Sequence, residues 1–85
     1  MPKSTFTDGY ASMLAILIEL RRASSVTQTA LSKKLGKAQP FISNIERGVR
    51  RIDVIEFYAF VMALGGDPES VFRRVVQGLP RKVRI

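Results

Sequence analysis

Apolar residues recur every three or four positions along most of the chain, a spacing that predicts helices rather than strands. The first apolar stripe consists of Tyr10, Met13, Leu14, Leu17 and Ile18. Thr7 or Asp8 stands just before it, and either side chain can accept a hydrogen bond from the free amides at a helix start. We therefore predict a first helix from this cap to about Arg22.

The next two predicted helices are short and lie close together in the sequence. The second helix starts from an N-cap at Thr27 and runs to Leu35, and Gly36 ends it because glycine readily adopts left-handed backbone angles. Its buried side is expected to consist of Ala30, Leu31 and Leu35. A turn of about three residues that begins with this glycine leads into a third helix over residues 38–47.

The fourth and fifth helices have the clearest start signals. Asp53 and Glu56 have the spacing of a capping box, and the apolar segment after them is unbroken up to a pair of glycines. Asp67 followed by Pro68 opens the fifth helix, because proline suits the first helical position and aspartate accepts from the free amides. This helix is expected to reach about Gln77.

Five helical segments without a strand pattern predict an all-α fold, a compact bundle of about five short helices. The chain has 85 residues, of which 46% are hydrophobic, and this suits one small domain with one core. We place that domain at residues 1–78 and a short basic tail at residues 79–85. The longest uncharged runs are too short to cross a bilayer, so we expect no membrane segment and a cytoplasmic location.

The chain contains neither cysteine nor histidine, and this restricts the chemistry open to it. Structural zinc sites, thiol nucleophiles, disulfides and the usual general base are all excluded. Asp53 and Glu56 form a conceivable carboxylate pair, but at the start of a helix they are more simply a cap. We therefore expect no enzyme activity, no metal, no cofactor and no small-molecule ligand.

The net charge of +7 favours a polyanionic partner, and its distribution along the chain is uneven. Between residues 33 and 51, six basic residues stand against a single acid, Glu46. Between residues 52 and 72, four acids occur without any lysine or arginine. This separation suggests that the basic middle of the chain binds a polyanion, while the acidic and apolar segment after it has another role.

The predicted third helix combines an apolar side with an unusual polar side. On a helical wheel Ile42 and Ile45 lie together. The opposite side carries Pro40, Ser43, Asn44 and Arg47, with Gln39 at its edge. A single exposed polar residue usually just faces solvent, but ordinary exposed helix faces favour Glu, Lys and Arg, whereas amides both donate to and accept from an adenine edge. With the short glycine turn before it, this helix has the pattern of the DNA-reading member of a helix-turn-helix.

The run that begins at Val26, VTQTALSKKLGKAQPFISNIERG, resembles the Xre-type helix-turn-helix of phage Cro proteins and repressors, which is lambda-repressor-like. The similarity extends from Leu20 to about Phe72 and so covers most of the chain. It implies a transcriptional regulator, a repressor, that binds double-stranded DNA sequence-specifically. It also implies a homodimer on a palindromic operator, with the helix at 38–47 in the major groove.

The resemblance also implies roles for individual residues. Base contacts are expected from Gln39, Pro40, Ser43 and Asn44. Contacts to the sugar-phosphate backbone are expected from Thr27, Gln28, Lys33, Lys37, Arg47, Arg50 and Arg51. Arg21 and Glu46 match a structural salt bridge between the first and third helices.

The sequence departs from the family pattern at two positions of the third helix. Ala38 stands where a serine or threonine cap is usual, so Gln39 is expected to cap the helix instead, with Pro40 at its first position. Phe41 replaces a typically small polar residue and borders the core side of the wheel. We expect Phe41 to pack against a neighbouring helix rather than to touch a base.

The fourth helix is apolar on nearly all sides, and a small domain buries only one stripe of such a helix. We expect the surplus apolar surface, with part of the fifth helix, to contact a second copy of the chain. The expected interface residues are Phe57, Phe60, Val61, Val71, Phe72 and Val75. Two alternatives remain open at this point. One is an antitoxin that binds a toxin through these helices and regulates its own promoter; the other is a nonspecific binder of nucleic acid or acidic membranes, in which the amides would be idle.

Overall fold

The computed structural model describes residues 7–83 and forms five helices in that range. They are α1 (Asp8–Ala23), α2 (Gln28–Lys34), α3 (Pro40–Glu46), α4 (Val54–Ala63) and α5 (Pro68–Gln77). Residues 7–83 include no strand, so the all-α prediction is confirmed. Helix α3 is shorter at both ends than the predicted range 38–47.

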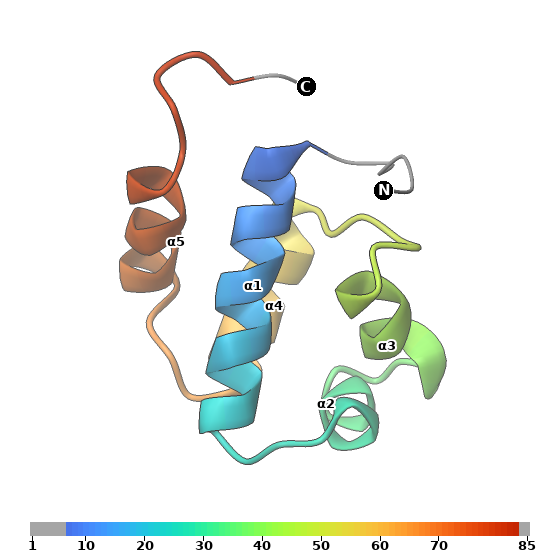
Figure 1. The fold of residues 1–85 in the computed structure, drawn as a ribbon. Helices are drawn as coiled ribbons and strands as arrows, with labels where there is room; N and C mark the ends of the chain where they lie inside the picture. Colours follow the sequence, from blue (N-terminus) through green and yellow to red (C-terminus); the bar gives the residue numbers. More distant parts are fainter. Residues whose placement is uncertain (1–6, 84–85) are drawn as a thin grey trace.

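The helices form a bundle with a Cα radius of gyration of 12.7 Å. In Figure 1, α1 runs through the middle, α5 lies on one side of it, and α2 and α3 lie on the other. Helix α5 packs on both α1 and α4, and α2 packs on both α3 and α4. The α2–α3 pair therefore forms one flank of the bundle.

Side-chain caps start four of the helices where the sequence predicts them. Thr7 caps α1 and Thr27 caps α2, each accepting a hydrogen bond from the backbone amide three residues ahead. Asp53 and Glu56 form the predicted capping box of α4, in which each side chain accepts from the other's backbone amide. Asp67 caps α5. A cap of this kind contributes about 0.5–2 kcal/mol, so these helix starts are encoded locally.

One hydrophobic core holds the bundle together, and all five helices contribute to it. Its buried members are Tyr10, Leu14, Leu17, Leu31, Ile42, Ile45, Phe57, Phe60, Val61, Val71 and Val75. Phe41 packs against this core, as expected. Ala30 was expected on the buried side of α2 but is exposed, and Ser32 is fully buried, because the side of α2 that faces α3 carries Ser32. Among the helices of residues 7–83, none has both the length and the apolarity to cross a membrane.

The dimer surface expected from the sequence requires a correction at the level of residues. Five of its six assigned residues are buried in the core of a single chain, namely Phe57, Phe60, Val61, Val71 and Val75. They are buried because α4 and α5 pack these stripes into the bundle, which leaves only Phe72 of the assigned set exposed. The large apolar side chains that stay exposed on these two helices are Val54, Ile55, Tyr58, Met62, Phe72 and Val76. Dimerisation itself stays a prediction, and its expected interface now consists of these exposed apolar residues.

The chain after α5 turns back towards the start of α1 (Figure 1). Leu79 packs against the core, and a Cβ placed on Gly9 would lie only 2.8 Å from Leu79 Cδ2. Leu79 therefore belongs to the packed domain, although the sequence placed it in the tail. Arg81 and Lys82 beyond it are exposed. Positions 1–6 and 84–85, which the predicted domain and tail include, lie outside the described residues.

Candidate nucleic-acid interface

Helix α3 is anchored on one side and open on the other. Ile42 and Ile45 are fully buried. Of the residues predicted to contact bases, Gln39 and Pro40 are exposed, while Ser43 and Asn44 are half-buried. At 100° per residue Pro40, Ser43 and Asn44 lie on the side opposite the isoleucines and Gln39 lies at the edge of that side, so the fold brings the four close together on the outward part of the helix.

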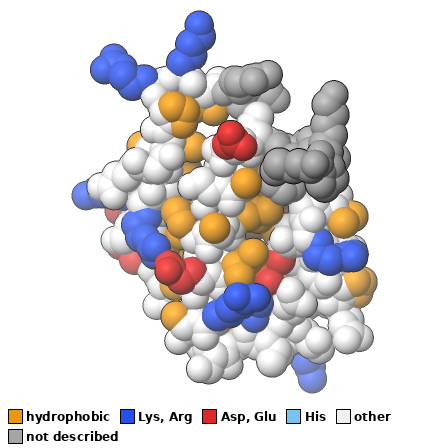
Figure 2. All heavy atoms as spheres, in the orientation of Figure 1, with side chains coloured by type: hydrophobic (Ala, Val, Ile, Leu, Met, Phe, Trp, Pro, Cys, Tyr) orange, Lys and Arg blue, Asp and Glu red, His pale blue; other side chains and the backbone are white. Residues whose placement is uncertain are grey.

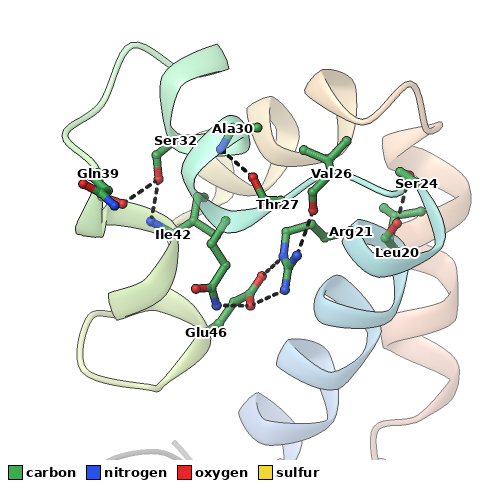
Figure 3. A network of polar contacts seen from close by, with 11 residues as sticks. Leu20, Arg21, Ser24, Val26, Thr27, Ala30, Ser32, Gln39, Ile42 and Glu46 are labelled. Carbon is green, nitrogen blue, oxygen red and sulfur yellow. Dashed lines mark hydrogen bonds and ion pairs between the residues drawn. The ribbon is translucent and has the colours of Figure 1, made fainter.

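The start of α3 differs from the sequence prediction. Gln39 already has helical backbone angles (φ −50°, ψ −43°) and its side chain makes no capping hydrogen bond, so the expected Gln39 cap is wrong. Ser32 of α2 takes this part instead: its Oγ accepts from the amide of Ile42 at 3.1 Å and donates to the carbonyl oxygen of Gln39 at 3.2 Å (Figure 3). Pro40 does occupy the first helical position. The cap of the outward-facing helix thus comes from the neighbouring helix.

Both amide side chains on the outward side of α3 have a protein partner. Gln39 Nε2 donates to Thr29 Oγ1 of α2 at 3.4 Å. Arg47 Nη2 donates to Asn44 Oδ1 at 2.8 Å. Both bonds are exposed to solvent, so each orients its amide but can be exchanged for a hydrogen bond to another partner.

A buried ion pair ties α3 to α1, as the resemblance implied. Arg21 donates from Nε to Glu46 Oε2 at 2.6 Å and from Nη2 to Oε1 at 3.0 Å, and the two side chains are only 10% and 5% exposed (Figure 3). Arg21 Nη1 also donates to the carbonyl of Val26 at 2.8 Å. Gln28, expected at a phosphate, donates from Nε2 to Glu46 Oε1 at 2.8 Å. One carboxylate therefore joins α1, α2 and α3.

The loop between α3 and α4 carries two arginines with different surroundings. Arg50 donates to both carboxylate oxygens of Glu56, at 2.8 and 2.7 Å, and its guanidinium lies 4.9 Å from the centre of the Phe41 ring. These hydrogen bonds raise the pKa of Arg50 and lower the pKa of Glu56. The guanidinium of Arg51 lies 4.2 Å from the centre of the Tyr10 ring. No carboxylate within residues 7–83 forms an ion pair with Arg51.

The other residues predicted to contact the DNA backbone lie around the two helices. Thr27, Lys33 and Lys37 are exposed, and the Thr27 hydroxyl also caps α2. Lys37 Nζ lies 5.4 Å from the centre of the Phe41 ring, on the same aromatic side chain that Arg50 approaches. On the face shown in Figure 2, Lys and Arg side chains stand apart around a hydrophobic middle, so that face offers no continuous basic surface.

Sequence reasoning missed Thr29 and Ser32, the two α2 residues that hold Gln39. Their contacts join residues seven and ten positions apart, which neither a helical period nor a local cap rule detects. The one available signal was the alanine at position 38, because a helix start without its own cap requires an acceptor from elsewhere.

In the part of the chain that the structure describes, no cluster of acidic side chains could hold a metal ion.

Comparison with known proteins agrees with this arrangement. The helix-turn-helix family model matches residues 17–71. An XRE-family like protein from Pseudomonas syringae pv. tomato str. DC3000 is 38% identical, with a TM-score of 0.80 over 85% of this chain and 88% of that chain. The clp gene regulator ClgR from C. glutamicum shares the fold at 18% identity, with a TM-score of 0.72 over 91% of this chain and 100% of that chain. No curated protein matches. The chain belongs to the Xre-type helix-turn-helix family of DNA-binding transcriptional regulators.

Proposed function

We propose that this chain represses transcription by binding double-stranded DNA at a specific sequence, with α3 in the major groove. The anchoring of α3 carries the proposal: Ile42 and Ile45 are fully buried, and the opposite side presents amide and hydroxyl groups to solvent. Groups of this kind pair with base edges in the major groove. In this role the protein works in the cytoplasm and needs neither a cofactor nor a catalytic residue.

The proposed contacts fall into two sets. Base edges are contacted by Gln39, Pro40, Ser43 and Asn44. The sugar-phosphate backbone is contacted by Thr27, Gln28, Lys33, Lys37, Arg47, Arg50 and Arg51. Backbone contacts fix the position of the protein on the duplex, and base contacts provide the sequence preference. Arg50 contributes less than Arg51 in this proposal, because Glu56 already compensates the charge of Arg50.

We further propose a homodimer on a palindromic operator. One helix in the groove reads only a few base pairs, so two copies about 34 Å apart give a site of useful length. The exposed apolar side of α4 and α5 supports this, because contiguous apolar surface of a small domain marks a protein contact. Phe72 lies within that side: it packs edge to face on Phe57, with ring centres 5.9 Å apart, and stays 52% exposed.

Selection of duplexes from a random library by the purified protein tests this function. We expect enrichment of one palindromic sequence whose half-sites are about one helical turn apart. Light scattering of the selected complex should give two chains per duplex. A library that shows no enrichment after repeated rounds would contradict sequence-specific binding, and a single enriched half-site bound tightly by one chain would contradict the dimer.

A second candidate function is an antitoxin that binds a toxin and regulates its own promoter. The observation that favours it is an apolar groove between α4 and α5, lined by Val54, Phe57, Tyr58, Met62, Pro68 and Phe72 with Asp67 and Glu69. The two acids give this groove a negative margin that suits a basic partner protein. The two candidates differ in what fills the groove. A stable dimer of the isolated chain at micromolar concentration favours the homodimeric repressor. A chain that is monomeric when isolated, and that copurifies from its host with one basic protein in a fixed ratio, favours the antitoxin.

A further inference from the structure

The start of α3 has no cap of its own. Gln39 is already helical and its side chain is turned to Thr29, and Ala38 before it has no side-chain acceptor. The first amides of a helix have no partner within the helix and must be satisfied from outside. In α1, α2, α4 and α5 the outside partner is the residue directly before the helix, whereas α3 takes it from α2.

Ser32 supplies that partner and makes a second bond at the same place. Its hydroxyl accepts from the amide of Ile42 at 3.1 Å and donates to the carbonyl of Gln39 at 3.2 Å. The Ser32 side chain and its bond with the Ile42 amide are buried, so water cannot replace that bond without opening the contact between α2 and α3. Thr29 lies about one turn before Ser32 on the same helix and bonds the Gln39 side chain at 3.4 Å. Two hydroxyls of α2 therefore hold the backbone and the side chain of Gln39.

We propose that Ser32 is a positioning residue for DNA recognition: it fixes the start of α3, and with it Gln39, relative to α2. The proposal rests on the proposed reading of bases by α3. According to this proposal, Ser32 makes no contact with DNA and acts through the backbone of Gln39 and Ile42. A contacting group must be held to within about 0.5 Å of its productive position, and a helix of seven residues has few other bonds to hold its first turn.

Replacement of Ser32 by alanine removes both bonds while changing the volume of the side chain little. The amide of Ile42 then lies in a buried place without its partner, and the carbonyl of Gln39 loses its link to α2, so we expect the first turn of α3 to shift. Such a shift moves Gln39 while the Ile45 anchor and the Arg21–Glu46 pair hold the end of the helix. The expected result is a folded protein whose sequence preference is reduced.

Amide hydrogen exchange of the unmodified protein gives the first test. The amide of Ile42 should exchange slowly, like an amide inside a helix, although it lies in the first turn. In Ser32→Ala it should lose this protection, while the amide of Phe60 in the core helix α4 keeps most of its own. Exchange of Ile42 in the unmodified protein at the rate of a free amide would overturn the proposal, whether or not Ser32→Ala folds.

The second test measures preference rather than stability. The affinity for the library-selected duplex is divided by the affinity for its scrambled sequence, at a temperature where circular dichroism shows each variant folded. Ser32→Ala should lower this ratio about fivefold, the lower end of what one base-reading side chain contributes. Ser70→Ala on α5 removes a hydroxyl that also makes a hydrogen bond, donating to the N-cap residue Asp67 at 2.7 Å, and should leave the ratio unchanged.

A matched control separates positioning from a general loss of stability. Val75→Ala destabilises the core from α5, far in sequence from the helix-turn-helix, and should lower the melting temperature without lowering the ratio. If Ser32→Ala keeps the ratio of the unmodified protein, or lowers it no more than Val75→Ala does, Ser32 is only structural and the proposal is wrong. If the unmodified protein prefers no duplex at all, the proposed function fails instead, and the exchange of Ile42 still decides whether Ser32 caps α3.

Discussion

Arg50 and Glu56 form a two-pronged ion pair across the loop that joins α3 to α4, with N–O distances of 2.8 and 2.7 Å. The same Glu56 carboxylate closes the capping box of α4. One acid therefore both starts α4 and holds an arginine that the sequence assigns to DNA. We therefore expect the stability of the protein to depend on pH and, in the proposed complex, the strength of DNA binding to depend on Glu56.

Acid should weaken the folded protein partly through Glu56. Its pKa is lowered in the folded state by the hydrogen bonds from Arg50, so the unfolded chain takes up this proton first, near the ordinary value of 4.5. The stabilisation is therefore complete above that pH and is lost as the pH falls through the lower folded-state pKa. Urea unfolding between pH 3 and pH 7 should show a shallower acid loss for Glu56→Gln than for the unmodified protein. Arg50→Ala should show the same shallower loss, and an unchanged acid profile in this variant would exclude Arg50 as the cause.

Salt dependence should separate the two arginines of this loop. Arg51→Ala is expected to weaken binding to selected and scrambled duplexes alike and to reduce the slope of log K against log salt by about one unit, because a phosphate contact releases counterions whatever the sequence. Glu56→Gln should change the slope in the opposite direction, since it leaves the charge of Arg50 uncompensated. Binding titrations at several salt concentrations measure both. A loss confined to the selected duplex in Arg51→Ala would contradict its assignment to the backbone.

Asn44→Ala should reduce sequence preference. A bidentate contact discriminates only where its base is present, so the variant should lose about 1–3 kcal/mol on the selected duplex and much less on a scrambled one. The hydrogen bond from Arg47 to Asn44 is lost as well, which leaves Arg47 free for a phosphate. Titrations of the variant on both duplexes check this. Equal losses on the two duplexes would show that Asn44 does not read a base.

The buried Arg21–Glu46 pair should matter far more for stability than an exposed pair of similar length. Glu46→Ala leaves Arg21 buried without its partner, which costs about 3–5 kcal/mol. Glu19→Ala breaks the pair of Glu19 with Arg74, which is 2.7 Å long against 2.6 Å for the buried pair but has both side chains at least half exposed, and should cost about 0–1 kcal/mol. Urea unfolding followed by circular dichroism compares the two. Similar midpoints for both variants would contradict the role given to the buried pair.

A charge on the exposed apolar side of α4 should separate the proposed dimer. Met62→Glu places a carboxylate in the expected contact and should weaken self-association at least about tenfold while the chain stays folded. Ala15→Glu puts the same charge on an exposed position of α1 and serves as the control. Light scattering over a concentration series measures both. If the unmodified chain is a monomer at tens of micromolar, the proposed interface is absent.

Local signals in the sequence predicted most of the fold. Thr27 and the Asp53–Glu56 box fix their helix starts through neighbours three residues away, and such contacts survive in any fold that keeps the helix. The burial of Ile42 and Ile45 followed from the helical period, because Phe41 borders the same side of α3 and the opposite side is polar apart from Pro40. These features depend on few residues at short separation.

The wrong predictions concern helices whose hydrophobic period does not distinguish one side from another, and contacts between residues that are far apart in the sequence. Helix α4 is apolar on nearly all sides, so the sequence could not show that Phe60 faces the core while Met62 faces out. The sequence predicts Gln39 as the cap of α3, because Ala38 replaces the usual serine or threonine and Pro40 suits the first helical position. The acceptor is instead Ser32, which only the packing of α2 on α3 brings close. The sequence predicts Arg50 only as a cation available to DNA, whereas in the structure Arg50 forms an ion pair with Glu56.

The bond from Gln28 to Glu46 also bears on the entropy of DNA binding. A primary amide carries two N–H donors, and Glu46 engages one of them at 2.8 Å. In the proposed complex the second donor reaches a phosphate without breaking the first bond, so the side chain is already in place before the duplex arrives. Ordering a free side chain costs about 0.5–1.5 kcal/mol on binding. For Gln28 the free-energy cost of ordering the side chain is included in folding instead of binding. Its donor is therefore preorganised for the duplex and is connected through Glu46 and Arg21 to the interior of the bundle.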